Sequence, residues 1–125
     1  MKKPFAALAA LALLGFAGTA VADSISEVWE CTLKEDKTVE QVQAVNSKWL
    51  AFVNGHSKGG VTSAVGRAMV GSLVGFVFID TYPDIETWAS VKKALDDDSG
   101  DEFDQMFGEL STCTNNSLWR IEPTK

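Results

Sequence analysis

Two cysteines, Cys31 and Cys113, are the only ones in this chain of 125 residues, and they stand near opposite ends of the part expected to fold. A disulfide between them would tie the two ends of a domain together. Closing a loop of about eighty residues stabilises a fold by roughly 4 to 5 kcal/mol on the chain-entropy model. The alternative is a reactive thiol pair, but the spacing is not that of a Cys-x-x-Cys motif. We therefore predict a structural disulfide.

The first 22 residues have the three-part pattern of a secretory signal peptide. Lys2 and Lys3 precede an apolar run over residues 5–16, and a stretch of small residues ends at Ala22. The run is shorter than the roughly 20 apolar residues of a membrane span. The pattern predicts cleavage after Ala22, a domain over residues 23–125, and a periplasmic or secreted bacterial protein without membrane contact after cleavage. Such a compartment is oxidising, which favours the disulfide.

Composition and charge limit the kinds of partner. Of all residues, 46% are hydrophobic and 10% aromatic, which is enough for one buried core. The formal net charge is -6, whereas non-specific binding of nucleic acid needs an excess of Lys and Arg. We expect a single folded domain that does not bind nucleic acid.

The hydrophobic periodicity predicts the order strand, helix, strand, strand, helix, strand. Thr38 and Gln41 form a capping-box pattern at the start of the first helix. The expected elements cover residues 27–33, 38–54, 61–70, 73–79, 84–95 and 117–122, with a further helical turn or two before Cys113. This order indicates a ferredoxin-like βαββαβ sandwich, an α+β fold with a four-stranded antiparallel sheet and two helices on one face. Its first and last strands are antiparallel neighbours, which would bring Cys31 and Cys113 together.

The alternation of side chains along each strand assigns one sheet face to the helices and leaves the other open. We assign to the helix side Trp29, Leu33, Trp119 and Ile121. Phe76 and Phe78 belong to an expected central strand that is apolar at both parities, and we place them on the open face. A second copy of the chain would cover such an apolar face, so we expect a homodimer through the open sheet face.

The expected strand Val74-Gly75-Phe76-Val77-Phe78 is followed by Asp84-x-x-x-Trp88. With these residues and this element order, the chain resembles an exported branch of the dimeric α+β barrel superfamily. Members of that superfamily include antibiotic-biosynthesis-type monooxygenases. The resemblance implies a pocket between the open sheet face and the helices or loops at its edge, lined by aromatic and a few polar side chains. No functional residue of the superfamily is carried over to this chain.

Charged and aromatic side chains near the open face are the candidate ligand-binding residues. The alternation places two carboxylates and one arginine on that face, and a second arginine falls at the end of the second strand. The full candidate set is Glu30, His56, Arg67, Phe76, Phe78, Asp80 and Arg120. The alternative is a group of ion pairs at a dimer interface or its rim, which is commoner than a catalytic carboxylate.

His56 is the only histidine, in the glycine-rich segment 54–60. It is a possible general base or haem ligand, but a solvated turn residue is the commoner case. Without a second histidine or clustered cysteines, a conventional zinc or iron site lacks its ligands, and we predict no metal and no cofactor. The acidic segment 96–102 resembles a calcium loop whose glycine is out of register, so we interpret it as a solvated helix junction.

No base, nucleophile or metal set stands out, which favours binding over catalysis. We expect a dimeric, non-catalytic protein that binds a small apolar or aromatic ligand or a protein partner. The alternative is a cofactor-independent monooxygenase or isomerase of the dimeric α+β barrel type. The sequence leaves open whether the protein is an enzyme.

Overall fold

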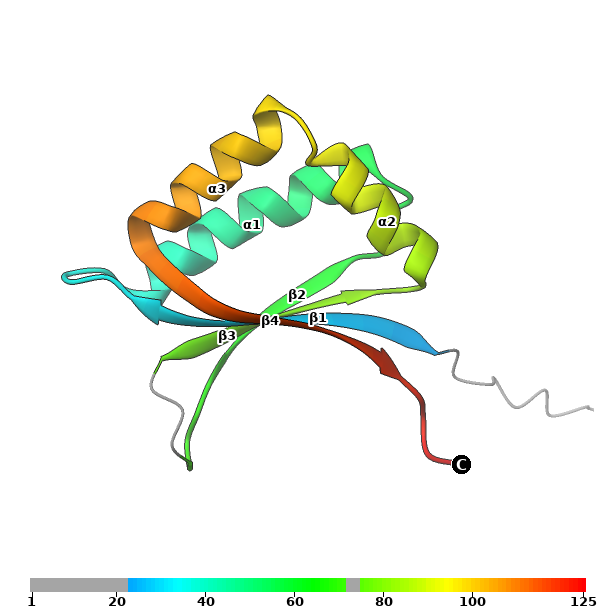
Figure 1. Cartoon of the computed structure of the whole chain (residues 1–125), viewed down its shortest axis with the longest axis horizontal. Helices are drawn as coiled ribbons and strands as arrows, with labels where there is room; N and C mark the ends of the chain where they lie inside the picture. Colours follow the sequence, from blue (N-terminus) through cyan, green and yellow to red (C-terminus); the bar gives the residue numbers. More distant parts are fainter. Residues whose placement is uncertain (1–22, 72–74) are drawn as a thin grey trace, which may run out of the picture.

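The computed structural model describes residues 23–71 and 75–125 and contains one four-stranded antiparallel sheet. The strand order is β2 (Thr62–Arg67), β3 (Phe76–Tyr82), β1 (Ser24–Leu33) and β4 (Ser111–Ile121). The helices α1 (Val39–His56), α2 (Ile85–Ala94) and α3 (Asp98–Leu110) lie together on one side of this sheet (Figure 1). The predicted ferredoxin-like α+β fold is confirmed. The predicted signal peptide at residues 1–22 lies outside the described residues.

Side-chain caps fix where each helix begins. The Thr38 hydroxyl accepts a hydrogen bond from the backbone N–H of Gln41, and the Gln41 side chain accepts one from the backbone N–H of Thr38, so the predicted capping box is present. Asp84 caps α2 as expected. Asp97 caps a third helix, because its carboxylate accepts from the backbone N–H of Ser99. The expected second helix is α2, and the further helical turn or two expected before Cys113 is the longer helix α3. The acidic segment 96–102 contains the junction between them and the first residues of α3.

The disulfide between Cys31 and Cys113 joins β1 to β4, as predicted. Next to it, the pairing of the two strands shifts register between Glu30 and Cys31. Such a bulge adds one residue to one strand and reverses which of its side chains face which side. Trp119 is therefore paired with Ser26 on the side away from the helices, and Ile121 is there as well. Our assignment of Trp119 and Ile121 to the helix side is wrong for this reason.

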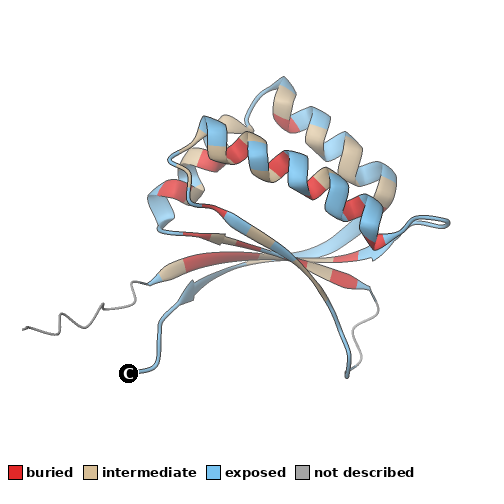
Figure 2. Cartoon of the chain, turned by 180° about the vertical axis from the view of Figure 1, so that it is seen from behind, coloured by how far each residue is buried: buried red, intermediate tan, exposed pale blue. Residues whose placement is uncertain are grey.

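The aromatic side chains of β3 face the helices. Phe76 and Phe78 are buried, and the Phe78 ring packs edge-on against Phe107 of α3 with the ring centroids 5.3 Å apart. Asp80 shares their side of the strand and is also buried. Our placement of Phe76, Phe78 and Asp80 on the open face is wrong, because β3 is apolar at both parities and alternation alone could not orient it. Figure 2 shows buried residues along the helices and the sheet.

We use "open sheet face" for the side of the sheet away from the helices. Glu30 lies there, as predicted, because it alternates with Glu27 and Cys31, which face the helices. Three large apolar side chains on this face are at least a third exposed, namely Ile79 at 38%, Ile121 at 44% and Trp119 at 56%. The open sheet face therefore keeps an apolar surface, although its members differ from those expected.

Candidate functional site

A cavity of about 360 Å³ lies between the sheet and the helices. This volume is within the range of small-molecule sites. Its aromatic walls come from both layers and consist of Trp29, Trp49, Phe78, Phe103 and Phe107. Its polar side chains are Asn46, Asp80, Lys92, Asp104 and Ser111, and Cys113 of the disulfide also lines it. The cavity is therefore mainly aromatic, with a few polar groups that could orient a ligand.

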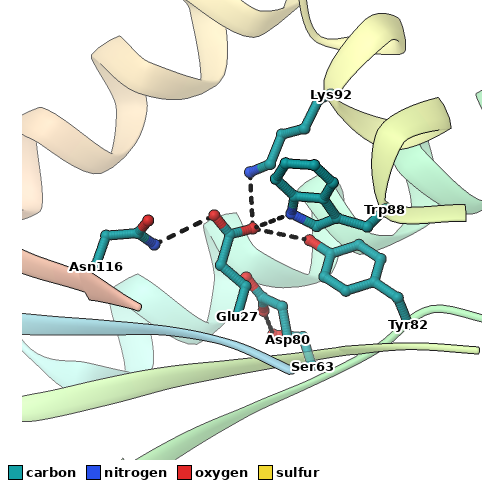
Figure 3. A network of polar contacts seen from close by, with 7 residues as sticks. All are labelled: Glu27, Ser63, Asp80, Tyr82, Trp88, Lys92 and Asn116. Atoms are coloured by element: carbon teal, nitrogen blue, oxygen red, sulfur yellow. Dashed lines mark hydrogen bonds and ion pairs between the residues drawn. The ribbon is translucent and has the colours of Figure 1, made fainter. Parts of the chain in front are cut away.

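Glu27 of β1 is the centre of a buried polar network beside the cavity (Figure 3). Its Oε2 atom accepts from Trp88 Nε1 at 3.2 Å and from the Tyr82 hydroxyl at 3.4 Å, and it pairs with Lys92 Nζ at 2.7 Å. Its Oε1 atom accepts from Asn116 Nδ2 at 3.2 Å. Burial raises the pKa of Tyr82, so the phenol stays protonated and donates. Glu27 is only 3% exposed, but four donors compensate for its burial.

Asp80 lies directly opposite Glu27, on β3, and has far fewer partners. Its Oδ1 atom accepts from Ser63 Oγ at 2.5 Å, and Ser63 Oγ accepts in turn from Asn46 Nδ2 at 2.8 Å. Burial raises the pKa of Asp80 to about 6; the Ser63 hydrogen bond opposes this rise and the nearby Glu27 charge adds to it. A carboxyl group with such a pKa exchanges its proton near neutral pH, as a general base or a pH-dependent binding group would.

Lys92 is the cation at the cavity wall. Its ammonium group lies 5.9 Å from the centroid of the Trp29 ring and 5.7 Å from that of Trp88, in addition to its ion pair with Glu27. These distances are within the range of cation–π attraction. A carboxylate and two indole rings therefore hold this cation in place.

The structure brings only part of the predicted candidate set to this cavity. Phe78 and Asp80 line it, and Phe76 packs against Phe78 with ring centroids 5.2 Å apart. The other candidates are elsewhere: Glu30 is on the open sheet face, and His56 stacks on Phe52 at the end of α1. Arg67 pairs with Glu40 of α1 at 3.4 Å.

Arg120 differs from its expected position on the open face. Because of the bulge, Arg120 pairs with Ile25 and has the parity of β4 that faces the helices. Its guanidinium is exposed and lies 4.0 Å from Asp23. The predicted charged cluster on the open sheet face therefore does not form. Glu30 is the one charged candidate that keeps its expected face.

Sequence reasoning missed Glu27, Lys92 and the cavity residues of α1 and α3. One signal was available for Glu27, which has the same parity as Trp29 and Cys31 on a strand face that is otherwise apolar. A carboxylate at such a position has to be buried with partners. Lys92 likewise falls beside the apolar stripe of its helix. These two charges at apolar positions indicate a buried ion pair.

Within residues 23–71 and 75–125, no group of three or more His, Cys, Asp and Glu side chains could hold a metal ion. None of the helices in these ranges has the length and apolar character needed to cross a membrane. The disulfide is consistent with an oxidising, extracytoplasmic location.

No protein-family model and no curated protein matches the sequence. Solved structures do share its fold. SnoaB, a cofactor-independent oxygenase from Streptomyces nogalater, is 19% identical with a TM-score of 0.60, and the match covers 82% of this chain and 97% of SnoaB. A NIPSNAP-like domain protein from Burkholderia xenovorans is 13% identical with a TM-score of 0.55, covering 84% of this chain and 88% of that one.

A third structure, described as a dimeric ferredoxin-like protein of unknown function from Thermobifida fusca, is 8% identical with a TM-score of 0.47, covering 79% of this chain and 90% of that one. The first two of these structures confirm the predicted fold. At these identities the likeness concerns the fold alone.

Proposed function

We propose that this chain is an exported, homodimeric protein that binds a small aromatic molecule in the cavity between the helices and the sheet. The observation that carries this proposal is the composition of the cavity, which is lined by five aromatic side chains and by a buried carboxylate with one hydrogen-bond donor. Aromatic walls favour a flat apolar ligand, and isolated polar groups fix its orientation.

The proposal is tested with a neutral aromatic probe, 2-(1-naphthyl)ethanol, by isothermal titration calorimetry. Gly108 of α3 lines the cavity, and a Cβ there would meet nothing within 4 Å. Gly108→Leu would therefore add a bulky side chain at the wall of the cavity, at a position where its Cβ has room. We expect this change to weaken binding at least about tenfold, or roughly 1.4 kcal/mol.

Gly55→Leu is the matched control, because Gly55 also lies on a helix with open space at its Cβ but does not line the cavity. It should leave binding unchanged. Trp119→Ser, on the open sheet face, should leave it unchanged as well. If Trp119→Ser abolished binding and Gly108→Leu did not, the probe would bind the open sheet face and the cavity proposal would be wrong.

Homodimerisation through the open sheet face is the second part of the proposal. Ile79, Trp119 and Ile121 supply an exposed apolar surface that a second copy would cover. In analytical ultracentrifugation, Trp119→Ser should weaken the dimer, whereas Leu118→Ser should not, because Leu118 is similarly exposed but has the opposite parity on the same strand. A monomeric unmodified protein would remove this part of the proposal.

Export is the third part, and it rests on the three-part pattern of residues 1–22 and on the disulfide. Protein secreted by the native host should begin at Asp23 and contain no free thiol. Intact mass before and after alkylation measures both properties. A product that retains Met1 would contradict export by cleavage.

A cofactor-independent oxygenase or isomerase remains the alternative, favoured by one observation: burial raises the pKa of Asp80, in an aromatic cavity, to about 6. Such a group could remove a proton from a bound carbon acid. Proton exchange at the activated C–H of 2-tetralone in D2O, followed by NMR, tests this activity. Exchange faster than in buffer that disappears in Asp80→Asn would favour the enzyme, and no acceleration would favour a binding protein.

A further inference from the structure

We propose that the cavity takes an aromatic ligand carrying an ammonium group, which is bound by the carboxylate of Asp80. This inference rests on the proposed function, because it names the chemical class of ligand for the same cavity. It comes from a comparison of the two carboxylates of the buried sheet face and their surroundings.

Asp80 has an acceptor atom available to a ligand. The residue is only 6% exposed, and its Oδ1 atom is bonded to Ser63. Within residues 23–71 and 75–125, Oδ2 has no hydrogen-bond partner. Every side-chain oxygen in these ranges that is fully sealed from solvent does have a partner, so Oδ2 is not fully sealed. Since Asp80 lines the cavity, Oδ2 is reached from the cavity. A ligand there would meet a buried acceptor with no competing donor on it.

Asp80 has no ion-pair partner among the described residues, although the Lys92 charge acts on it and lowers its pKa. The ion pairs of residues 23–71 and 75–125 involve Glu27, Glu40 and Asp23 as the acidic partners. Lys92, the cationic residue that lines the cavity, is 2.7 Å from Glu27 and is held there by two indole rings. Asp104 adds a second acidic group to the lining. The cavity therefore has an excess of negative charge that a cationic ligand would balance.

Lys92 shows which chemistry holds a cation in this protein, because a carboxylate and the faces of aromatic rings surround its ammonium group. The cavity offers the same kinds of group a second time, because Asp80 and five aromatic side chains line it together. Here no cation is in contact with the carboxylate, because the ammonium group of Lys92 is paired with Glu27. Ammonium groups bind to such arrangements through both charge and cation–π attraction. The geometry thus favours a protonated amine over a neutral or anionic molecule of the same shape.

Binding of this kind depends on pH in a defined direction. Asp80 accepts a hydrogen bond from Ser63 of β2 and lies opposite Glu27 of β1. The other titratable groups near it are Lys92 of α2, Asp104 of α3 and the Tyr82 phenol. Because burial raises the pKa of Asp80 to about 6, the carboxylate becomes neutral below that pH while an alkyl ammonium stays charged. The preference for the amine should therefore be lost as the pH falls through 6.

The test compares three naphthalene probes of matched shape by titration calorimetry at pH 7.5. They are 2-(1-naphthyl)ethylamine, 2-(1-naphthyl)ethanol and 1-naphthaleneacetate, which are cationic, neutral and anionic. We expect the amine to bind about tenfold more tightly than the alcohol, and the acetate to bind more weakly than the alcohol. Asp80→Asn should abolish the difference between amine and alcohol.

Asp96→Asn is the matched control, because it removes the same charge from an exposed residue that does not line the cavity. It should keep the tenfold preference. If Asp80→Asn fails to fold, the unmodified protein is used at two pH values instead. The ratio of its affinity for the amine to its affinity for the alcohol should fall from about ten at pH 7.5 towards one at pH 5. Equal or tighter binding of the alcohol at pH 7.5 overturns the inference and leaves the proposed function intact. Failure of all three probes to bind overturns the proposed function itself.

Discussion

Glu27 and Asp80 lie opposite each other on neighbouring strands and face the same helices, yet their surroundings differ. Glu27 has an ion pair and three hydrogen-bond donors, all from residues of the chain. Asp80 has one donor and borders a cavity. A buried carboxylate with every acceptor position filled is fixed in place and contributes to the fold. A buried carboxylate with a free oxygen makes the fold less stable and can serve a ligand.

Removing the charge of Glu27 should have the largest effect on stability. Glu27→Gln leaves Lys92 without its counter-ion and places an amide N–H where Trp88 and Tyr82 donate. We expect the free energy of unfolding to fall by about 4 kcal/mol, as when one member of a buried ion pair is removed. Urea denaturation measures it. Glu30→Gln, on the opposite side of the same strand, should change stability by less than about 0.5 kcal/mol.

The same substitution at the other carboxylate should have the opposite sign. The pKa of Asp80 rises from 3.8 to about 6 on folding, so the folded protein binds this proton more tightly than the unfolded chain does. The free energy of unfolding therefore falls as the pH rises from about 4 to 6. Asp80→Asn should therefore stabilise the protein at pH 8 by about 2 kcal/mol, against an upper bound of roughly 3 kcal/mol from the shift.

At pH 4 that gain should be absent, because the carboxyl group is then mostly protonated in the folded protein. Urea denaturation at both pH values measures the difference. Asp96→Asn provides the control, because it removes the same charge from an exposed residue that does not line the cavity. It should show no such dependence. A destabilised Asp80→Asn protein at pH 8 would mean that Asp80 has structural partners like those of Glu27.

Removing the Ser63 hydroxyl should have a smaller effect on stability. Ser63→Ala removes the one donor to Asp80, and since this hydrogen bond lowers the pKa of Asp80, its loss should move that pKa above 6. A carboxyl ¹³C NMR titration measures the shift, and the accompanying loss of stability should be about 1 kcal/mol. Ser47→Ala, whose hydroxyl bonds only within α1, should leave the Asp80 titration unchanged. An unchanged pKa in Ser63→Ala would show that another group sets it.

Much of the fold could be predicted because its signals are local. Alternation in β1, the capping box of α1 and the Asp84 cap each depend on a few neighbouring residues. The cysteine pair added a long-range restraint that agreed with the topology. The third helix was less visible, because its start depends on the Asp97 cap within a run of similar acidic residues.

The candidate site could not be predicted, because it depends on which way two strands face. One extra residue at the bulge reversed Trp119, Arg120 and Ile121 relative to Cys113, and nothing in the local sequence marks it. In β3, apolar residues at both parities made the orientation of Phe78 and Asp80 undetermined. The prediction therefore placed Phe76, Phe78, Asp80 and Arg120 on the wrong side of the sheet. Glu30 kept its predicted side, and Phe78 and Asp80 line the cavity.

The position of the disulfide has a consequence for proteolysis. Three helices and two strands, α1, β2, β3, α2 and α3, fall between Cys31 and Cys113 in the chain. A protease that hydrolyses one peptide bond in the loop 57–61 would leave two polypeptides still joined through sulfur. A nicked molecule of this kind would run as one species on a gel without reductant and as two with it, so a single cut would not release a fragment.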